Sequence, residues 1–184
     1  MFRKSGITIM LVAIALSAMR VAAATPEPNP QSLNDLQRNE RIRKELATLP
    51  YYGVFDNLSF EVNGGTVTLT GQVVRPITRS GAEQRVTKTA GVTNVINNIE
   101  VLPLSTFDDS IRLAAYRAIF RTDGLYRYAM GANPAIHIVV NHGHIILEGV
   151  VSSAFESQTA FLAANGVSGV FSVINNLRVE HART

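Results

Sequence analysis

Residues 60–73 read Phe-Glu-Val-Asn-Gly-Gly-Thr-Val-Thr-Leu-Thr-Gly-Gln-Val, and residues 138–151 read Ile-Val-Val-Asn-His-Gly-His-Ile-Ile-Leu-Glu-Gly-Val-Val. The two stretches lie 78 positions apart and share asparagine, glycine, leucine and valine at equivalent places without a gap. The offset holds beyond them, so that residues 63–101 match residues 141–179. A fixed offset with matched glycines and matched apolar positions predicts one structural unit duplicated in tandem.

The repeated unit begins with a predicted β-hairpin. Apolar and polar residues alternate on both sides of Asn63-Gly64-Gly65, which is typical of two half-buried strands joined by a tight turn. Gly71 lies inside the second strand, where a glycine indicates a bulge or a close approach of backbone. A helix from Pro76 to Gly91 and a third strand over residues 95–101 follow.

A helix precedes each hairpin. The first is predicted from about Asp35 to Pro50, and the second begins with Asp108-Asp109, whose charges suit a helix N-terminus. The second copy holds nine extra residues near 124–134, and Ser153 with Glu156 predicts a capping box for its last helix. We therefore expect an α+β protein of two tandem α-β-β-α-β domains, over residues 35–103 and 106–180. Each has a small three-stranded sheet with two helices on one face.

The N-terminus predicts export. Arg3 and Lys4 precede a short apolar run from Ile7 to Met19, and Ala22-Ala23-Ala24 resembles a signal-peptidase site. We expect residues 1–24 to be a signal peptide cleaved after Ala24, residues 25–34 to be a linker, and the protein to be periplasmic. The apolar run is shorter than the roughly 20 residues of a membrane span, so we expect no membrane-spanning segment after cleavage. The sequence has no cysteine, which excludes disulfides and thiol chemistry.

The charge balance argues against a nucleic-acid partner. Three of the seventeen Lys and Arg residues fall within residues 1–24, and all fourteen acidic residues lie beyond them. The exported chain of 160 residues is therefore formally neutral, without the basic footprint of a nucleic-acid-binding protein.

The faces of the two sheets that point away from the helices are predicted to differ. The first is polar, whereas the second carries Val139, Ile146 and Val150. An apolar outer face needs a cover or a partner. Either the inserted segment 125–130 or the first domain covers it, or it is an interaction surface. As an interaction surface it would comprise Val139, Ile146 and Val150 together with Tyr126 and Tyr128 of the inserted segment.

The hairpin motif, the alanine-containing helix after it and the Gly-Val-x-x-Val-x-Asn-x-hydrophobic-x-Val strand resemble the BON domain (bacterial OsmY and nodulation), present twice. The resemblance implies a periplasmic, non-enzymatic protein that binds phospholipid surfaces and supports the envelope under osmotic or other stress. Lipid contact in that family is linked to a helix of the second domain, yet residues 154–165 contain no Lys or Arg. The basic residues lie instead on or beside the second helix of the first copy: Arg75, Arg79, Arg85 and Lys88.

No constellation indicates catalysis, a cofactor or a metal site. His137, His142 and His144 read as exposed turn and strand residues, because a metal site needs three or four converging ligands. Asn97 and Asn175, on the core side of the third strands, are expected to make structural hydrogen bonds.

Two functions therefore stay open. One is association with an anionic phospholipid surface through the basic residues near the second helix of the first domain and through aromatic or apolar groups of the second domain. The other is a protein–protein interaction with an envelope partner through the outer face of the second sheet.

Overall fold

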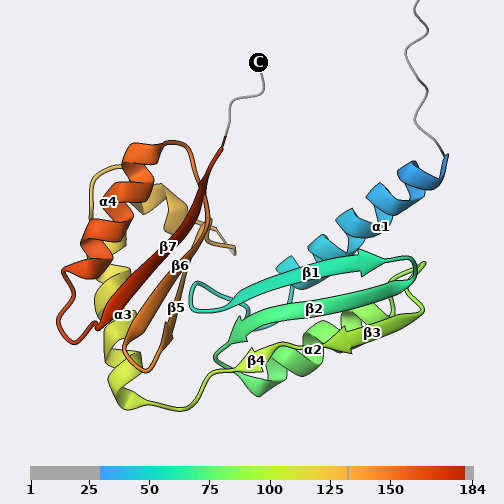
Figure 1. The fold of residues 1–184 in the computed structure, drawn as a ribbon, viewed down its shortest axis with the longest axis horizontal. Helices are drawn as coiled ribbons and strands as arrows, with labels where there is room; N and C mark the ends of the chain where they lie inside the picture. Colours follow the sequence, from blue (N-terminus) through green and yellow to red (C-terminus); the bar gives the residue numbers. More distant parts are fainter. Residues whose placement is uncertain (1–29, 132, 181–184) are drawn as a thin grey trace, which may run out of the picture.

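The computed structural model describes residues 30–131 and 133–180, which form two domains. Domain 1 contains α1 (Pro30–Ala47), β1 (Asn57–Asn63), β2 (Thr66–Val73), α2 (Pro76–Thr87), β3 (Asn94–Asn97) and β4 (Glu100–Val101). Domain 2 contains α3 (Thr106–Phe120), the 3-10 helix η1 (Tyr126–Ala129), β5 (Ile136–Asn141), β6 (His144–Val151), α4 (Ala154–Asn165) and β7 (Ser172–Val179). The predicted α+β tandem repeat is confirmed (Figure 1).

The structure describes only part of the segment for which a signal peptide and a linker are predicted. The expected signal peptide and most of the expected linker lie outside the described residues. The first helix begins at Pro30 and not near Asp35. Proline suits this place, because the first helical residue needs no backbone N–H inside the helix.

The sheets have the same strand order, which the sequence had left open. In domain 1 the central β2 is antiparallel to β1 and parallel to β3 and β4. In domain 2 the central β6 is antiparallel to β5 and parallel to β7. The sheets differ in the third strand, which is continuous in β7 but is interrupted between β3 and β4 in domain 1. The sheet of domain 1 is thus counted as four-stranded, where three strands were expected.

Glycines fix the hairpins as predicted. Gly71 has φ +117°, and a Cβ atom there would lie 2.1 Å from the carbonyl oxygen of Asn57. Gly149 has φ +123°, with a distance of 2.0 Å to the carbonyl oxygen of Ala135. A side chain fits at neither position, so the close backbone approach expected at Gly71 is confirmed and recurs in domain 2.

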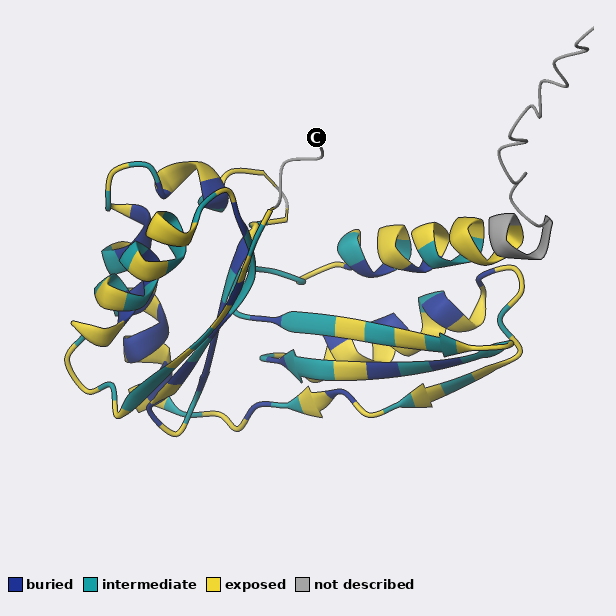
Figure 2. Cartoon of the chain, turned by 45° about the horizontal axis from the view of Figure 1, so that its top comes forward, coloured by how far each residue is buried: buried dark blue, intermediate teal, exposed yellow. Residues whose placement is uncertain are grey.

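Each domain buries its own core between the sheet and its two helices (Figure 2). The third strands are tied to the helices by the predicted asparagines. The Asn97 side-chain amide donates to the Arg79 carbonyl and to Glu83, and the Asn175 amide donates to the carbonyl and hydroxyl of Ser157. The structural role expected for both residues is confirmed.

The loop between α1 and β1 joins the domains. The Ile138 N–H donates to the Val54 carbonyl oxygen at 2.7 Å, and the Phe55 and Tyr116 rings pack edge to face at 6.3 Å. Val54 and Phe55 also pack against the core of domain 2. Figure 1 shows this loop of domain 1 reaching the sheet of domain 2, so domain 1 lies against β5, the edge strand of that sheet.

Candidate functional site

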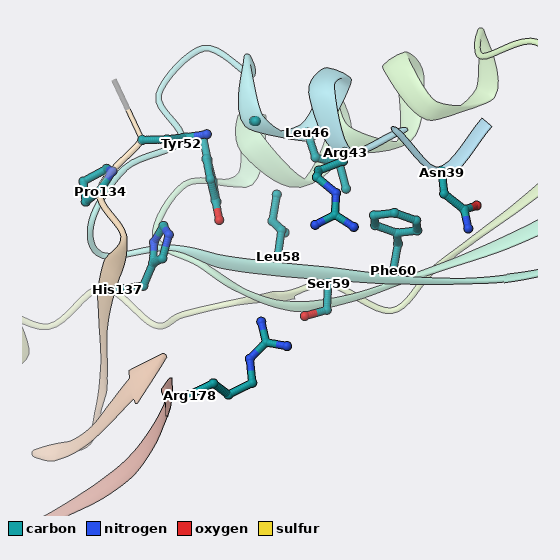
Figure 3. A pocket seen from close by; sticks show the side chains of 12 residues that line it. Asn39, Arg43, Leu46, Tyr52, Leu58, Ser59, Phe60, Pro134, His137 and Arg178 are labelled. Atoms are coloured by element: carbon teal, nitrogen blue, oxygen red, sulfur yellow. The ribbon is translucent and has the colours of Figure 1, made fainter. Parts of the chain in front are cut away.

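A cleft of about 540 Å³ lies between the domains. We call it the interdomain cleft. Its walls come from α1, the α1–β1 loop and β1 of domain 1, and from β5, the residues before it and β7 of domain 2 (Figure 3). The lining residues are Asn39, Arg43, Leu46, Ala47, Tyr52, Leu58, Ser59, Phe60, Asn133, Pro134, His137 and Arg178. Two arginines are among them and no carboxylate is, so the lining favours an anionic group.

One end of the interdomain cleft is closed by the domain contact itself. The His137 Nδ1 atom lies 3.2 Å from the Gly53 carbonyl oxygen, and its ring packs on Tyr52 at a centroid distance of 5.5 Å. Burial lowers the pKa of His137 below its ordinary value, although the hydrogen bond to Gly53 and the carboxylate of Asp56 act in the opposite direction. Burial also raises the pKa of Tyr52 to about 12. Both groups are therefore neutral at neutral pH.

Asp56 holds the loop that makes this contact. Its carboxylate accepts hydrogen bonds from the backbone N–H groups of Gly53 and Val74, at 3.0 and 2.7 Å. Burial raises the pKa of Asp56, against the two amide hydrogen bonds, which lower it. The carboxylate thus fastens the α1–β1 loop to the end of β2 and fixes the position of Val54.

A second, smaller hollow lies on the helix layer of domain 1. We call it the α1–α2 hollow; it measures about 320 Å³ and is lined by Arg41, Glu45, Arg85, Lys88, Thr89 and Ala90. Arg85 donates to Glu45 at 3.3 Å and to the Thr48 hydroxyl at 3.2 Å, which fixes its guanidinium between the helices. Three cations with one carboxylate leave the hollow cationic.

The structure brings together two of the four predicted basic residues. Arg85 and Lys88 share the α1–α2 hollow. Arg79 lies outside it, and Arg75 stacks over the Tyr51 ring with its guanidinium carbon 4.9 Å from the ring centroid. Arg41 was not among the predicted site residues, because it lies on α1 and only the packing of the two helices places it beside Lys88.

The apolar residues predicted for an interaction face fall into two groups. Val139, Ile146 and Val150 lie on the outer face of the second sheet, because their strand neighbours point into the core. Val139 is 1% exposed, whereas Ile146 and Val150 are half-buried. In the strand register Ile146 pairs with Val139 on one side and with Ile174 on the other, and Ile174 is 52% exposed.

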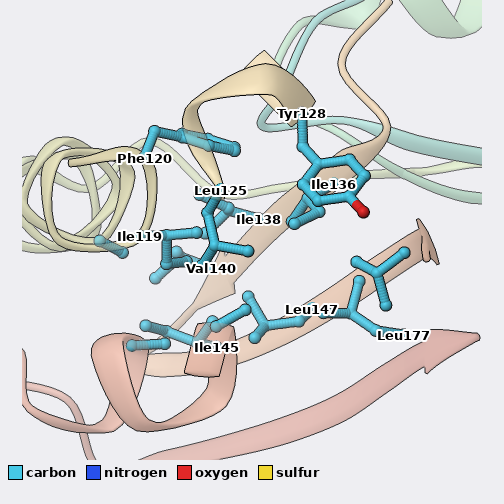
Figure 4. Packing of buried hydrophobic residues seen from close by; sticks show 14 of the residues in the cluster. Ile119, Phe120, Leu125, Tyr128, Ile136, Ile138, Val140, Ile145, Leu147 and Leu177 are labelled. Carbon is cyan, nitrogen blue, oxygen red and sulfur yellow. The ribbon is translucent and has the colours of Figure 1, made fainter. Parts of the chain in front are cut away.

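Tyr126 and Tyr128 lie elsewhere. The inserted segment packs into the core of domain 2, with Leu125 and Tyr128 among the buried residues (Figure 4). The Tyr128 hydroxyl donates to Glu156 and accepts from the Ser152 N–H, which ties the segment to the start of α4. Tyr126 is 63% exposed. The structure therefore does not bring the two tyrosines together with Val139, Ile146 and Val150.

The three histidines considered for a metal site are separated by their contacts. His137 faces Gly53, while the His144 ring lies 2.7 Å from the Ser172 hydroxyl. Among residues 30–131 and 133–180, no three His, Asp or Glu side chains gather as metal ligands. Over the same residues no helix has the length and apolarity to cross a membrane.

These observations define a tandem pair of small α+β modules that meet across a cationic cleft. The model of the BON domain matches residues 34–103 and 125–181, and the chain belongs to the BON-domain family. The family is one of binding or interaction modules and is generally non-enzymatic, and BON domains occur in periplasmic or envelope proteins. None of the curated proteins compared with the chain matches it.

Two solved structures of CdsD, a structural protein of the type III secretion system of Chlamydia trachomatis, are similar to the chain. The C-terminal domain is 16% identical, covers 77% of this chain and 96% of its own, and has a TM-score of 0.27. A second structure is 16% identical, covers 81% and 94%, and has a TM-score of 0.28. Similarity at this level does not inform the function of this chain.

Proposed function

We propose that the protein is a non-catalytic periplasmic binding protein that associates with anionic phospholipid surfaces and supports the integrity of the envelope or its tolerance of osmotic stress. The α1–α2 hollow is the observation that carries the proposal. Arg41, Arg85 and Lys88 surround it, and guanidinium and ammonium groups are the usual protein partners of phosphate. The predicted signal peptide and the envelope setting of BON domains support the location.

The expected attraction is moderate and depends on salt. Each Lys or Arg close to an anionic membrane contributes about 1 kcal/mol, and Glu45 offsets part of the charge in the hollow. Surface attraction of this kind falls off within a Debye length of about 8–10 Å, so we expect high salt to release the protein.

The test is co-sedimentation of residues 25–184 with vesicles. Vesicles of phosphatidylcholine alone are compared with vesicles that also contain phosphatidylglycerol, at low and at high salt. The double variant Arg41→Glu with Lys88→Glu is expected to bind anionic vesicles at least tenfold more weakly, from the loss of about 1 kcal/mol or more per charge. Arg117→Glu with Arg121→Glu, two exposed residues of domain 2, is the control with the same change in net charge. Equal binding to both kinds of vesicle, or an equal loss in both variants, contradicts the proposal.

A protein–protein interaction through domain 2 is the second candidate. It rests on Ile174 of β7, which is 52% exposed on the outer face of the sheet. Ile174 pairs with Ile146 of the neighbouring strand β6, and Val150 lies further along β6 on the same face. An exposed apolar side chain beside half-buried apolar neighbours on a sheet favours burial against a partner. If this face binds an envelope protein or a second copy, Ile174→Asp abolishes the association seen by crosslinking in envelope extracts and leaves vesicle binding unchanged. Association that survives Ile174→Asp rules this candidate out.

A further inference from the structure

The two hairpins present equivalent backbone groups at their outer edges. Leu58 pairs with Gly71 in domain 1, and Ile136 pairs with Gly149 in domain 2, which is the same register shifted by 78 positions. Successive residues of a strand turn their N–H and C=O groups to opposite sides. The backbone groups of Phe60 and Val62 therefore point the same way as those of Ile138 and Val140, their equivalents 78 positions later. The groups that point away from the central strand are therefore the same in both domains.

In domain 2 these outward groups are bonded. The Ile138 N–H donates to Val54, which lies in an irregular loop of domain 1. The Val140 carbonyl oxygen accepts from the Arg112 guanidinium at 2.6 Å. Arg112 is only 3% exposed. The outward backbone groups of Ile138 and Val140 on the β5 edge are therefore both covered, by Val54 and by Arg112.

In domain 1 the Leu58 backbone bonds to the Tyr52 side chain, and the same edge is open at Phe60 and Val62. Among the described residues, β2 is the only strand hydrogen-bonded to β1, although β5 lies close to it, and the outward groups of Phe60 and Val62 have no further hydrogen bond. Arg43 occupies the position of Arg112, since Ile42 and Ile111 are the equivalent buried residues one position earlier. Its side chain is 68% exposed, and its charged contact is with Glu40 at 3.6 Å. An unpaired strand edge is a template for pairing with another segment.

The interdomain cleft lies along this open edge. Three consecutive residues of β1, Leu58 to Phe60, line the cleft. Figure 3 shows Arg43 extending from α1 and Arg178 extending from β7 toward the same part of β1. The aliphatic groups of Leu46 and Leu58 and the ring of Phe60 supply apolar surface around Arg43, on the α1 side of β1, while Arg178 lies on the side of Ser59.

We propose that the interdomain cleft binds an extended, acidic polypeptide segment of a partner protein, which adds as a strand to the free edge of β1. Main-chain hydrogen bonds to Phe60 and Val62 supply affinity that does not depend on sequence, and side chains on alternate faces supply specificity. Side chains that face α1 meet Leu46, Phe60 and the stem of Arg43, and carboxylates on the opposite face of the added strand pair with Arg178. This site is separate from the α1–α2 hollow and does not depend on lipid association.

The chain itself contains a related contact. The loop residue Val54 already bonds to the edge of β5, where Ile138 occupies the place that Phe60 has in β1. Backbone capture at this position of the repeated hairpin is therefore present within the molecule. Charge decides the kind of partner, because the lining of the interdomain cleft has two arginines and no carboxylate.

The test is a titration of isotope-labelled residues 25–184, followed by amide NMR shifts. The probe is a blocked peptide of three valine–aspartate repeats. Expected shifts centre on Leu58 to Val62 and on Arg178. Arg43→Glu with Arg178→Glu is expected to weaken binding at least tenfold, while this variant binds a valine–lysine peptide of the same length. Both arginines are exposed, so the variant is expected to keep the dispersed spectrum of the folded chain.

Three outcomes overturn the proposal. The first is the absence of shifts along β1 with the aspartate peptide. The second is an equal response to a peptide with N-methylated backbone amides, because such a peptide cannot add as a strand. The third is an equal response to dihexanoyl phosphatidylglycerol, which would make the cleft a lipid-headgroup site. The Arg41→Glu with Lys88→Glu variant separates the two proposals, since it is expected to lose vesicle binding and to keep peptide binding.

Discussion

The first helix of each domain lies over the same turns but carries different side chains there. In domain 2 the Asp108 carboxylate, 1% exposed, accepts the backbone N–H groups of His142 and Gly143 at 3.0 and 2.8 Å. Asn39 holds the equivalent place in domain 1, and its side-chain oxygen is buried without a hydrogen-bond partner. Helix α3 therefore clamps its own hairpin, whereas α1 does not.

The neighbouring position shows the same contrast. Phe107 lies against Gly169 and pairs with the Phe171 ring at 6.0 Å, whereas Arg38 lies against the equivalent Gly91 and pairs with Asp35. The duplication thus kept the residues that dictate the backbone and changed those that cover it. Helix α3 is thus tied to the turns beneath it by hydrogen bonds and aromatic packing, while α1 places polar side chains over the equivalent turns.

The largest effect is expected where the domains are alike. Gly71→Ala and Gly149→Ala each place a Cβ atom about 2 Å from a backbone carbonyl oxygen at a strongly positive φ. We expect each substitution to lower the free energy of unfolding by roughly 3–5 kcal/mol. Chemical denaturation measures the loss, and Gly53→Ala, with open space around its Cβ position, is the control. A loss below that of the control in either domain would show that its hairpin can shift.

A difference between the domains is expected at the hairpin clamp. Asp108→Ala leaves two buried backbone N–H groups without an acceptor and is expected to cost roughly 2–3 kcal/mol. Asn39→Ala removes an oxygen that has no partner, so we expect little change. Thermal denaturation of both variants measures the contrast. Equal destabilisation would mean that α1 holds its hairpin as α3 does.

The asparagine ties give a smaller contrast. Asn175→Ala removes half-buried hydrogen bonds to Ser157 and is expected to cost about 1–2 kcal/mol, whereas Asn97→Ala removes bonds to exposed partners on α2 and is expected to cost about 0.5–1 kcal/mol. Hydrogen exchange of the third strands reports each loss locally. Faster exchange in β3 than in β7 for the paired variants would reverse the expected order.

The smallest effect concerns the contact between the domains. Because burial lowers the pKa of His137 from 6.5, the unfolded chain takes up this proton first. The contribution of His137 is therefore complete above about pH 6.5 and is lost as the pH falls toward the folded-state pKa. Asp56, with a pKa raised from 3.8, acts oppositely and at lower pH, since the folded form takes up its proton first.

Melting temperatures at about pH 7.5 and about pH 6 test this expectation, because that interval contains the titration of an ordinary histidine. The native chain is expected to lose more stability over the interval than His137→Gln, whose amide does not titrate. The groups facing His137 are Tyr52, the Gly53 carbonyl, Asp56 and Glu148. Equal pH dependence in both proteins would remove His137 as the cause.

The sequence predicted what the backbone requires. The repeat, the hairpins, the close approach at Gly71 and the structural role of Asn97 follow from glycine and from strand periodicity, which act locally. It did not predict the interrupted third strand, since Val95 to Ile99 closely resembles Val173 to Leu177. The sequence located the nine inserted residues, from the offset between the two copies, but it did not predict how they pack. The packing of Leu125 and Tyr128 into the core depends on the whole of domain 2.

The candidate sites were harder to predict, because they depend on how separate elements meet. Arg43 and Arg112 are the same residue at equivalent positions, yet one is exposed and the other is buried. Only the contact with Val140 distinguishes them. Likewise, Arg41 joins Arg85 and Lys88 through the packing of two helices, which no local pattern reports.

The hydrogen bond between Val54 and Ile138 has a consequence for the inheritance of the two modules. Duplicated domains can be copied singly into other proteins when each is complete by itself. Here the second module borrows a backbone acceptor from the first. A gene fragment encoding residues 106–180 alone would keep the Arg112 contact with Val140 but leave the Ile138 N–H on the β5 edge without its acceptor. Such a fragment is expected to self-associate through this part of the edge, which the native pair of domains keeps covered.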